Sequence, residues 1–100
     1  SLINEKNFQV KTITVLPGES LSLQKHKYRS ENWVVVKGIA KVTLDKQVKE
    51  LKVGESIFIP KQAIHRLENE QHENLIIIEV QTGEYLGEDD IIRIEDKYSR

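Results

Sequence analysis

The sequence contains no cysteine, which excludes disulfide bridges and thiolate metal sites. No apolar run approaches the roughly 20 residues that span a bilayer, and the longest runs, such as 75–78, are only four residues. Methionine is also absent and the chain begins at Ser1, so we expect a processed, trimmed or excised piece of a longer protein. The five glycines are scattered, and neither GxGxxG nor GxxxxGK[ST] occurs, so no nucleotide-binding loop is expected.

Neither sign of charge is in excess, because 15 Lys plus Arg stand against 16 Asp plus Glu, for a formal net charge of −1. A dedicated nucleic-acid-binding protein would carry a basic stripe, so we expect no nucleic acid partner. A length of 100 residues with 38% apolar and 31% charged side chains is typical of one folded domain. We therefore predict a single domain over residues 1–100, with no membrane partner.

Short alternating or β-branched apolar runs, separated by turn residues, recur along the whole chain. They number about nine at a spacing of roughly 8–12 residues, which is typical of an all-β sandwich or barrel. The predicted strands are 8–15, 21–26, 32–36, 39–44, 47–51, 56–59, 63–67, 75–80 and 91–95. No apolar stripe is long enough for a stable helix, and only the stretch 83–90 has room for a single helical turn.

Four polar residues interrupt the strand pattern and have side chains suited to a metal. Gln24 and His26 share one face of their predicted strand, because alternate residues of a strand point the same way. Glu31 precedes the most hydrophobic strand, and His65 lies in the strand after Pro60. Two imidazole nitrogens and two oxygens suit a borderline divalent metal such as zinc, and they also accept manganese, iron, cobalt or nickel.

Each of these residues also has an ordinary structural interpretation. A single histidine on a strand is more often hydrogen-bonded than metal-bound, and Gln24 or Glu31 alone would be interpreted as a solvent-facing side chain. Their combined spacing favours the site. The two ordered strings are Gly18-x5-Gln24-x-His26-x4-Glu31-x6-Gly38 and Gly54-x5-Pro60-x4-His65-x3-Asn69.

These two strings resemble the two signature motifs of the cupin superfamily, with Gln24 in place of the first histidine and Gln62 in place of a glycine. We expect Gln62 to change only the conformation of a turn. The strings Q-x-H-x-x-R-x-E-x-W and E-V-Q-x-G-x-Y-L-G-E-D-D-I-x-R are both present, and with them the chain is similar to the type II phosphomannose isomerase domain. In bacteria this domain is usually the C-terminal part of a bifunctional mannose-1-phosphate guanylyltransferase/mannose-6-phosphate isomerase.

The resemblance implies a cupin double-stranded β-helix, that is, a jelly-roll barrel. It also implies a metal-dependent aldose–ketose isomerase that interconverts mannose 6-phosphate and fructose 6-phosphate, with Gln24, His26, Glu31 and His65 as the metal ligands. That reaction moves a proton between C1 and C2 of the open-chain sugar. It requires a Lewis acid, a base and a cation for the phosphate.

Two arginines are candidates for contact with the substrate. Arg29 lies between the ligand residues and is predicted to bind the phosphate or to stabilise the enediolate; a solvated turn arginine is the alternative. Arg93 follows Ile92 on the last predicted strand, where an inward charge would need an anionic partner. A substrate phosphate is one such partner, and Glu79 or Asp96 is the alternative.

The base is predicted from a run of three carboxylates, Glu88, Asp89 and Asp90, that follows Gly87. Because like charges crowded together raise the pKa of one member, Asp89 and Asp90 are predicted to be catalytic. A solvated loop is the alternative. Trp33 shares a face with Glu31 and is predicted to pack in the core rather than to support the ligand.

The resemblance further implies a cytoplasmic protein, a sugar phosphate partner and a covalently linked guanylyltransferase domain. A homodimer is a further expectation, although no residue indicates its interface. Two other functions remain open at this point. One is a non-catalytic module that binds metal or sugar beside a mannose-1-phosphate guanylyltransferase, and the other is a purely structural cupin domain without metal.

Overall fold

The computed structural model describes residues 3–4 and 7–94, which contain strands and loops but no helix. The strands are β1 (Ile3–Asn4), β2 (Phe8–Val15), β3 (Gln24–Lys25), β4 (Arg29–Lys37), β5 (Ala40–Leu44), β6 (Gln47–Leu51), β7 (Ser56–Ile59), β8 (His65–Glu68), β9 (Leu75–Gly83) and β10 (Ile92–Arg93). The all-β prediction is therefore confirmed. No helix long and apolar enough to cross a membrane occurs in this part of the chain.

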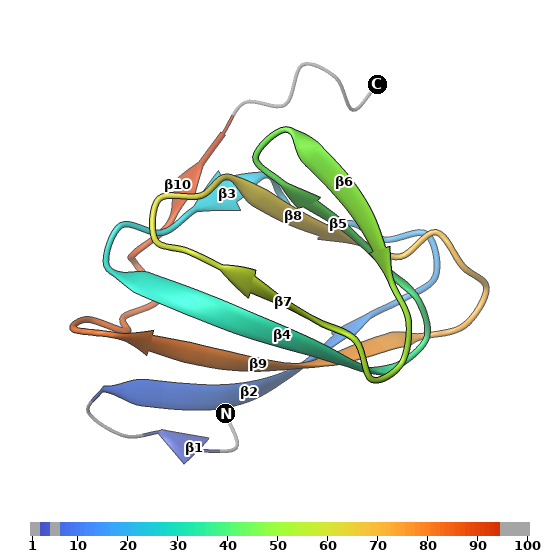
Figure 1. Ribbon diagram of the computed structural model, residues 1–100, viewed down its shortest axis with the longest axis horizontal. Helices are drawn as coiled ribbons and strands as arrows, with labels where there is room; N and C mark the ends of the chain where they lie inside the picture. Colours follow the sequence, from blue (N-terminus) through green and yellow to red (C-terminus); the bar gives the residue numbers. More distant parts are fainter. Residues whose placement is uncertain (1–2, 5–6, 95–100) are drawn as a thin grey trace.

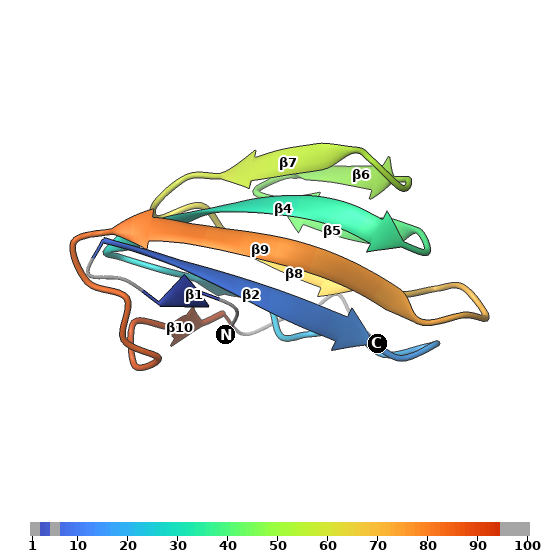
Figure 2. The same ribbon diagram turned by 90° about the horizontal axis from the view of Figure 1, so that it is seen from below.

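The strands form two five-stranded sheets that face each other as two layers (Figure 1, Figure 2). Sheet A has the order β1-β2-β9-β4-β7, and sheet B has the order β10-β3-β8-β5-β6. Every pairing between these strands is antiparallel. In sheet A, β9 therefore lies between β2 and β4, although it follows both of them in the sequence.

The two central strands of sheet A are longer than the sequence predicts. β4 begins at Arg29 rather than at residue 32, and β9 continues to Gly83 rather than ending at residue 80. The two extensions pair with each other, with Arg29 opposite Gly83 and Glu31 opposite Gln81. Their inward side chains are polar, so they interrupt the apolar alternation on which the prediction depends.

Other segments are shorter than predicted or differ in conformation. The predicted strand 21–26 is reduced to β3, and 91–95 is reduced to β10, with residue 95 outside the described residues. The stretch 83–90 contains no helical turn; it ends in a turn in which the Asp90 N–H donates to the Gly87 carbonyl at 3.1 Å. Gln62 has a φ of 71°, in the left-handed region that favours glycine, so the expected change of turn conformation finds no support.

The space between the sheets is apolar toward one end of the strands and polar toward the other. Along the inward face of β4 the residues run from Val35 through Trp33 to Glu31, and along β9 they run from Ile77 through Glu79 to Gln81. The strand register places Trp33 opposite Glu79. The apolar end contains the buried core, which consists of Val15, Trp33, Val35, Ala40, Val42, Leu51, Ile57, Ile59, Ala63, Leu67, Leu75 and Ile77.

Candidate metal centre

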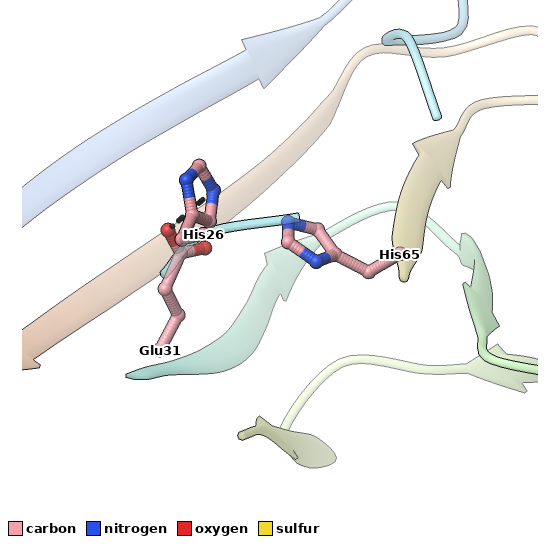
Figure 3. A group of neighbouring side chains, drawn as sticks. All are labelled: His26, Glu31 and His65. Atoms are coloured by element: carbon pink, nitrogen blue, oxygen red, sulfur yellow. Dashed lines mark ion pairs between the residues drawn. The ribbon is translucent and has the colours of Figure 1, made fainter. Parts of the chain in front are cut away.

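Three buried side chains meet at the polar end of the barrel (Figure 3). Glu31 comes from β4 in sheet A, His65 comes from β8 in sheet B, and His26 directly follows β3. One ligand atom of each residue lies within 4.8 Å of the others. The two imidazole rings are 5.0 Å apart between centroids. The structure therefore brings together three of the four predicted metal ligands.

Hydrogen bonds to backbone carbonyls orient both histidine rings. His26 Nδ1 lies 2.5 Å from the Asp90 carbonyl oxygen, and His65 Nδ1 lies 3.0 Å from that of Ala63. A carbonyl oxygen only accepts, so Nδ1 of each ring carries a proton, and Nε2 is the ring nitrogen left to bind a metal. Burial lowers the pKa of His65, which favours its neutral form. The donor set of two imidazole nitrogens and a carboxylate thus fits a divalent metal.

Gln24, the fourth predicted ligand, lies directly opposite His65 in the pairing of β3 with β8. Its side chain lines the same cavity as the three buried residues. Its Nε2 donates to the Ser22 carbonyl oxygen at 3.3 Å. The side-chain oxygen Oε1 is therefore the atom that could bind a metal such as zinc. Its role as a ligand remains a prediction.

Arg29 is buried and contacts two of the candidate ligands. Its Nε donates to Glu31 Oε2 at 2.8 Å, and its Nη2 lies 3.3 Å from His26 Nε2. Its Nη1 is buried without a hydrogen-bond partner among the described residues. The guanidinium therefore neutralises Glu31. It also contacts atoms of Glu31 and His26 that could bind a metal. Its alternative interpretation as a solvated turn arginine is excluded by its burial.

A second carboxyl group, Glu79, lies beside Glu31 in the cavity wall. The Trp33 indole N–H lies within hydrogen-bonding distance of Glu31 Oε1 (2.9 Å) and of Glu79 Oε2 (3.1 Å), and Gln81 Nε2 donates to Glu79 Oε1 at 2.6 Å. Burial raises the pKa of Glu79 to about 8, with a further contribution from Glu31. Burial also acts to raise the pKa of Glu31, but bonding to Glu79 and the charge of Arg29 outweigh it, so that pKa lies below its ordinary value.

The pair is therefore asymmetric near neutral pH, with Glu31 ionised and Glu79 protonated. Trp33 belongs to the apolar core, as predicted, and it also bonds to Glu31. Sequence reasoning did not propose Glu79 or Gln81 as site residues. The sequence did contain a signal for them. Glu79 and Gln81 occupy inward positions of an otherwise apolar strand, and a polar side chain buried there needs a buried partner.

The candidate ligands face a cavity of about 250 Å³. Besides them, its wall includes Arg29, Trp33, Glu79, Gln81, Lys11 and Glu88. Lys11 lies on β2 opposite Glu79, and its Nζ forms an ion pair with Glu88. The volume lies just below the range of drug-sized ligand pockets, so the cavity suits one small polar metabolite.

The structure does not place Asp89 and Asp90 at this cavity. Asp89 is exposed, and its carboxylate accepts a hydrogen bond from the Tyr85 hydroxyl at 2.5 Å. The buried Asp90 carboxylate accepts from the backbone N–H groups of Lys27 at 2.8 Å and Tyr28 at 2.9 Å. The predicted catalytic role of these two residues finds no support, because neither side chain lines the cavity. Asp90 instead fixes the loop after His26.

The prediction that Arg93 points inward is wrong. Arg93 is exposed on β10, the two-residue edge strand of sheet B, where it pairs with Gln24. Its side chain does not line the cavity, so a role in binding substrate there is not supported. The apolar neighbours that suggested an inward side chain lie in a segment too short for alternation to indicate direction.

The chain is similar to known proteins along nearly its whole length. The family model for "Mannose-6-phosphate isomerase C-terminal" matches residues 1–96. The mannose-1-phosphate guanylyltransferase ManC of Salmonella typhimurium is 54% identical over 95 residues, and the alginate biosynthesis protein AlgA of Pseudomonas putida is 57% identical over 93 residues. These alignments cover 95% and 93% of this chain but only 20% and 19% of the relatives. The chain thus spans about a fifth of the length of the curated relatives it matches.

Among solved structures, an uncharacterised conserved protein with a double-stranded β-helix domain from Klebsiella pneumoniae is similar with a TM-score of 0.82. The sequence identity is 20%, and the match covers 95% of this chain and 81% of that one. At this identity the similarity shows the fold alone, and it confirms the predicted double-stranded β-helix.

Proposed function

The chain belongs to the mannose-6-phosphate isomerase C-terminal family, and on that premise we propose that it interconverts mannose 6-phosphate and fructose 6-phosphate with a divalent metal. The observation that carries the proposal is the buried group of His26, Glu31 and His65, in which backbone carbonyls bind Nδ1 of both histidines and leave Nε2 as the atom for a metal. Gln24 is the proposed fourth ligand. Zinc is the proposed metal, and manganese, cobalt, nickel and iron suit the same donor set.

The residues around the ligands suit the transfer of a proton between two adjacent sugar carbons. When bound, the metal supplies a Lewis acid for the oxygens at those carbons. We assign the proton transfer to Glu79, because it is the buried carboxyl next to Glu31 in the cavity wall. Trp33 and Gln81 hold its two oxygens in place. Arg29 has a buried N–H group without a partner, which suits a substrate oxygen that gains negative charge.

The test is isomerisation of mannose 6-phosphate by the purified chain, with metal content measured in the same samples. Glu31→Gln and His65→Ala are expected to lose the metal and about 100-fold or more in kcat/KM, since each removes a ligand. His72→Ala is the matched control, because His72 is exposed and does not line the cavity. Full metal occupancy without turnover, by this chain and by a longer protein that contains it, would refute the proposal.

A second candidate function is a non-catalytic module that binds metal or sugar beside a guanylyltransferase domain. The observation that favours it is that the relatives are about five times longer than the matched region and that ManC is named as a mannose-1-phosphate guanylyltransferase. Under this alternative, the protein would bind metal and sugar phosphate but would not isomerise it. Activity of the isolated chain would exclude it.

The names of the relatives also suggest a cellular role. AlgA is named for alginate biosynthesis, so we propose that this chain helps to supply the mannose precursors of a polysaccharide. A linked guanylyltransferase domain, a cytoplasmic location and a homodimer are parts of the same proposal. Size-exclusion chromatography coupled to light scattering tests the dimer directly.

A further inference from the structure

Within the part of the chain that the structure describes, three Lys or Arg side chains line the cavity: Lys11, Arg29 and Arg66. They differ in what already binds them. Arg29 is buried against Glu31 and His26. Arg66 lies beside Glu68 on the same strand of sheet B, with its Nε 3.6 Å from that carboxylate. Lys11 pairs with Glu88, whose side chain is 72% exposed, whereas the Lys11 side chain is 21% exposed.

The pair of Lys11 and Glu88 is the one that an incoming anion can open most easily. Ion pairs with an exposed partner contribute little stability, whereas separating the buried Arg29 from Glu31 leaves an uncompensated buried charge. The hydrogen bond from Lys11 lowers the pKa of Glu88, which favours the ionised carboxylate. The Lys11 amino group lies at the wall of the cavity, where it faces this carboxylate.

The loop that carries Glu88 does not depend on this ion pair. The Gln9 side chain donates to the Leu86 carbonyl at 3.1 Å, which ties the loop to β2 independently of Lys11. Asp90 fixes the other end of the loop through the N–H groups of Lys27 and Tyr28. The Glu88 side chain can leave Lys11 while the loop keeps these contacts.

We propose that Lys11 binds the phosphate group of the substrate and that the phosphate takes the place of the Glu88 carboxylate on Lys11. This inference rests on the proposed function and deepens it, because it names the residue that would distinguish a phosphorylated sugar from a free one. It replaces Arg93, which is exposed outside the cavity. The reacting carbons would then lie toward the buried ligands, and the phosphate would lie toward Glu88.

The test compares Lys11→Met, Lys11→Arg and Glu88→Gln, all in metal-loaded protein, with Lys49→Met as the control. Lys49 is an exposed lysine on β6 that does not line the cavity. Calorimetry measures the binding of mannose 6-phosphate, inorganic phosphate and unphosphorylated mannose, and metal content is measured for each variant. Isomerase kinetics give KM and kcat separately.

Lys11→Met is expected to weaken mannose 6-phosphate and inorganic phosphate binding by about 10- to 100-fold, the usual worth of a charge-assisted contact. Its metal content and its binding of mannose should not change. Lys11→Arg should restore most of the affinity, Glu88→Gln should strengthen phosphate binding, and Lys49→Met should have no effect. In the isomerase assay, the loss in Lys11→Met should appear mainly as a higher KM.

Wild-type phosphate affinity in Lys11→Met overturns the inference, as does equal weakening for mannose or a loss of metal in that variant. If the wild type isomerises and KM in Lys11→Met is unchanged, the inference fails and the proposed function stands. If the wild type never isomerises but binds phosphate through Lys11, the proposed function fails and the inference stands. Absence of any phosphate binding by the wild type overturns the inference by itself.

Discussion

Replacing Arg29 with methionine is expected to destabilise the metal-free protein far more than the metal-loaded protein. The Arg29 Nε donates to Glu31 Oε2 at 2.8 Å, and both side chains are buried. Removing one partner of a buried ion pair costs about 3–5 kcal/mol, because the remaining charge has lost its compensation. Since each kcal/mol shifts Tm by about 4–8 °C in a domain of this size, Tm should fall by at least about 12 °C.

A divalent metal at His26, Glu31 and His65 would supply the positive charge that the methionine variant lacks. With saturating zinc, the loss should therefore shrink to about 1–2 kcal/mol, the usual cost of altered packing at one side chain. Zinc affinity should also rise in the variant, because the Arg29 guanidinium contacts Glu31 Oε2 and His26 Nε2, two atoms that the metal needs.

The assay is thermal unfolding followed by circular dichroism, in chelator and in zinc, beside a calorimetric zinc titration. Lys49→Met, which changes an exposed residue of β6, is the control for loss of a positive charge. Equal losses of Tm in chelator and in zinc would refute the reasoning that Arg29 and a metal compensate the same carboxylate. A variant that folds only with zinc would be the extreme form of the expected result.

Three further predictions concern residues around the site. Asp90→Asn should lower the free energy of unfolding by about 2 kcal/mol in urea titrations. The Lys27 and Tyr28 N–H groups donate to different oxygens of Asp90, and the substitution turns one of these acceptors into a donor. Unchanged stability would contradict the anchoring role. The pKa of Glu79 is about 8 in the folded protein and 4.5 ordinarily. The stability that its protonated form contributes is therefore fully present below about pH 4.5 and is lost as the pH rises toward 8. Metal-free Glu79→Gln should therefore gain stability relative to wild type across that range, and parallel stability curves would disprove the shift. Gln62→Gly should raise Tm by a few degrees, since it relieves a left-handed φ of 71° that costs a side chain about 1 kcal/mol; a lower Tm would show that the side chain makes a compensating contact.

The fold could be predicted from the sequence because its strands alternate strongly. Runs such as 8–15 and 56–59 are rich in β-branched and aromatic residues and end at turn residues, and their bounds match the structure. The candidate ligands followed from motif spacing, which indicated that distant residues such as Glu31 and His65 belong to one site. Alternation alone could not indicate this, because it gives the face of a strand but not the partner strand.

The remaining parts of the site depend on register and loop geometry. Lys11 and Glu79 point inward by simple alternation, but only the pairings of β9 with β2 and β4 place them level with Trp33, one inward position from Glu31. The orientation of Asp90 depends on hydrogen bonds to backbone groups more than 60 residues earlier in the chain. No periodic pattern encodes such a contact, so the carboxylate run could not indicate that the Asp89 and Asp90 side chains lie outside the cavity wall.

The position of β9 within sheet A also determines when the site can form. β9 (Leu75–Gly83) inserts between β2 and β4, which precede it in the sequence, so these two strands have no shared neighbour until it arrives. During synthesis, His26 and Glu31 leave the ribosome long before Glu79 and Gln81. For that interval the cavity lacks the side chains that β9 contributes to its wall. Pairings between segments so far apart in sequence fold slowly and leave strand edges exposed to other chains. A stalled or truncated product that ends before residue 75 should therefore aggregate rather than bind metal.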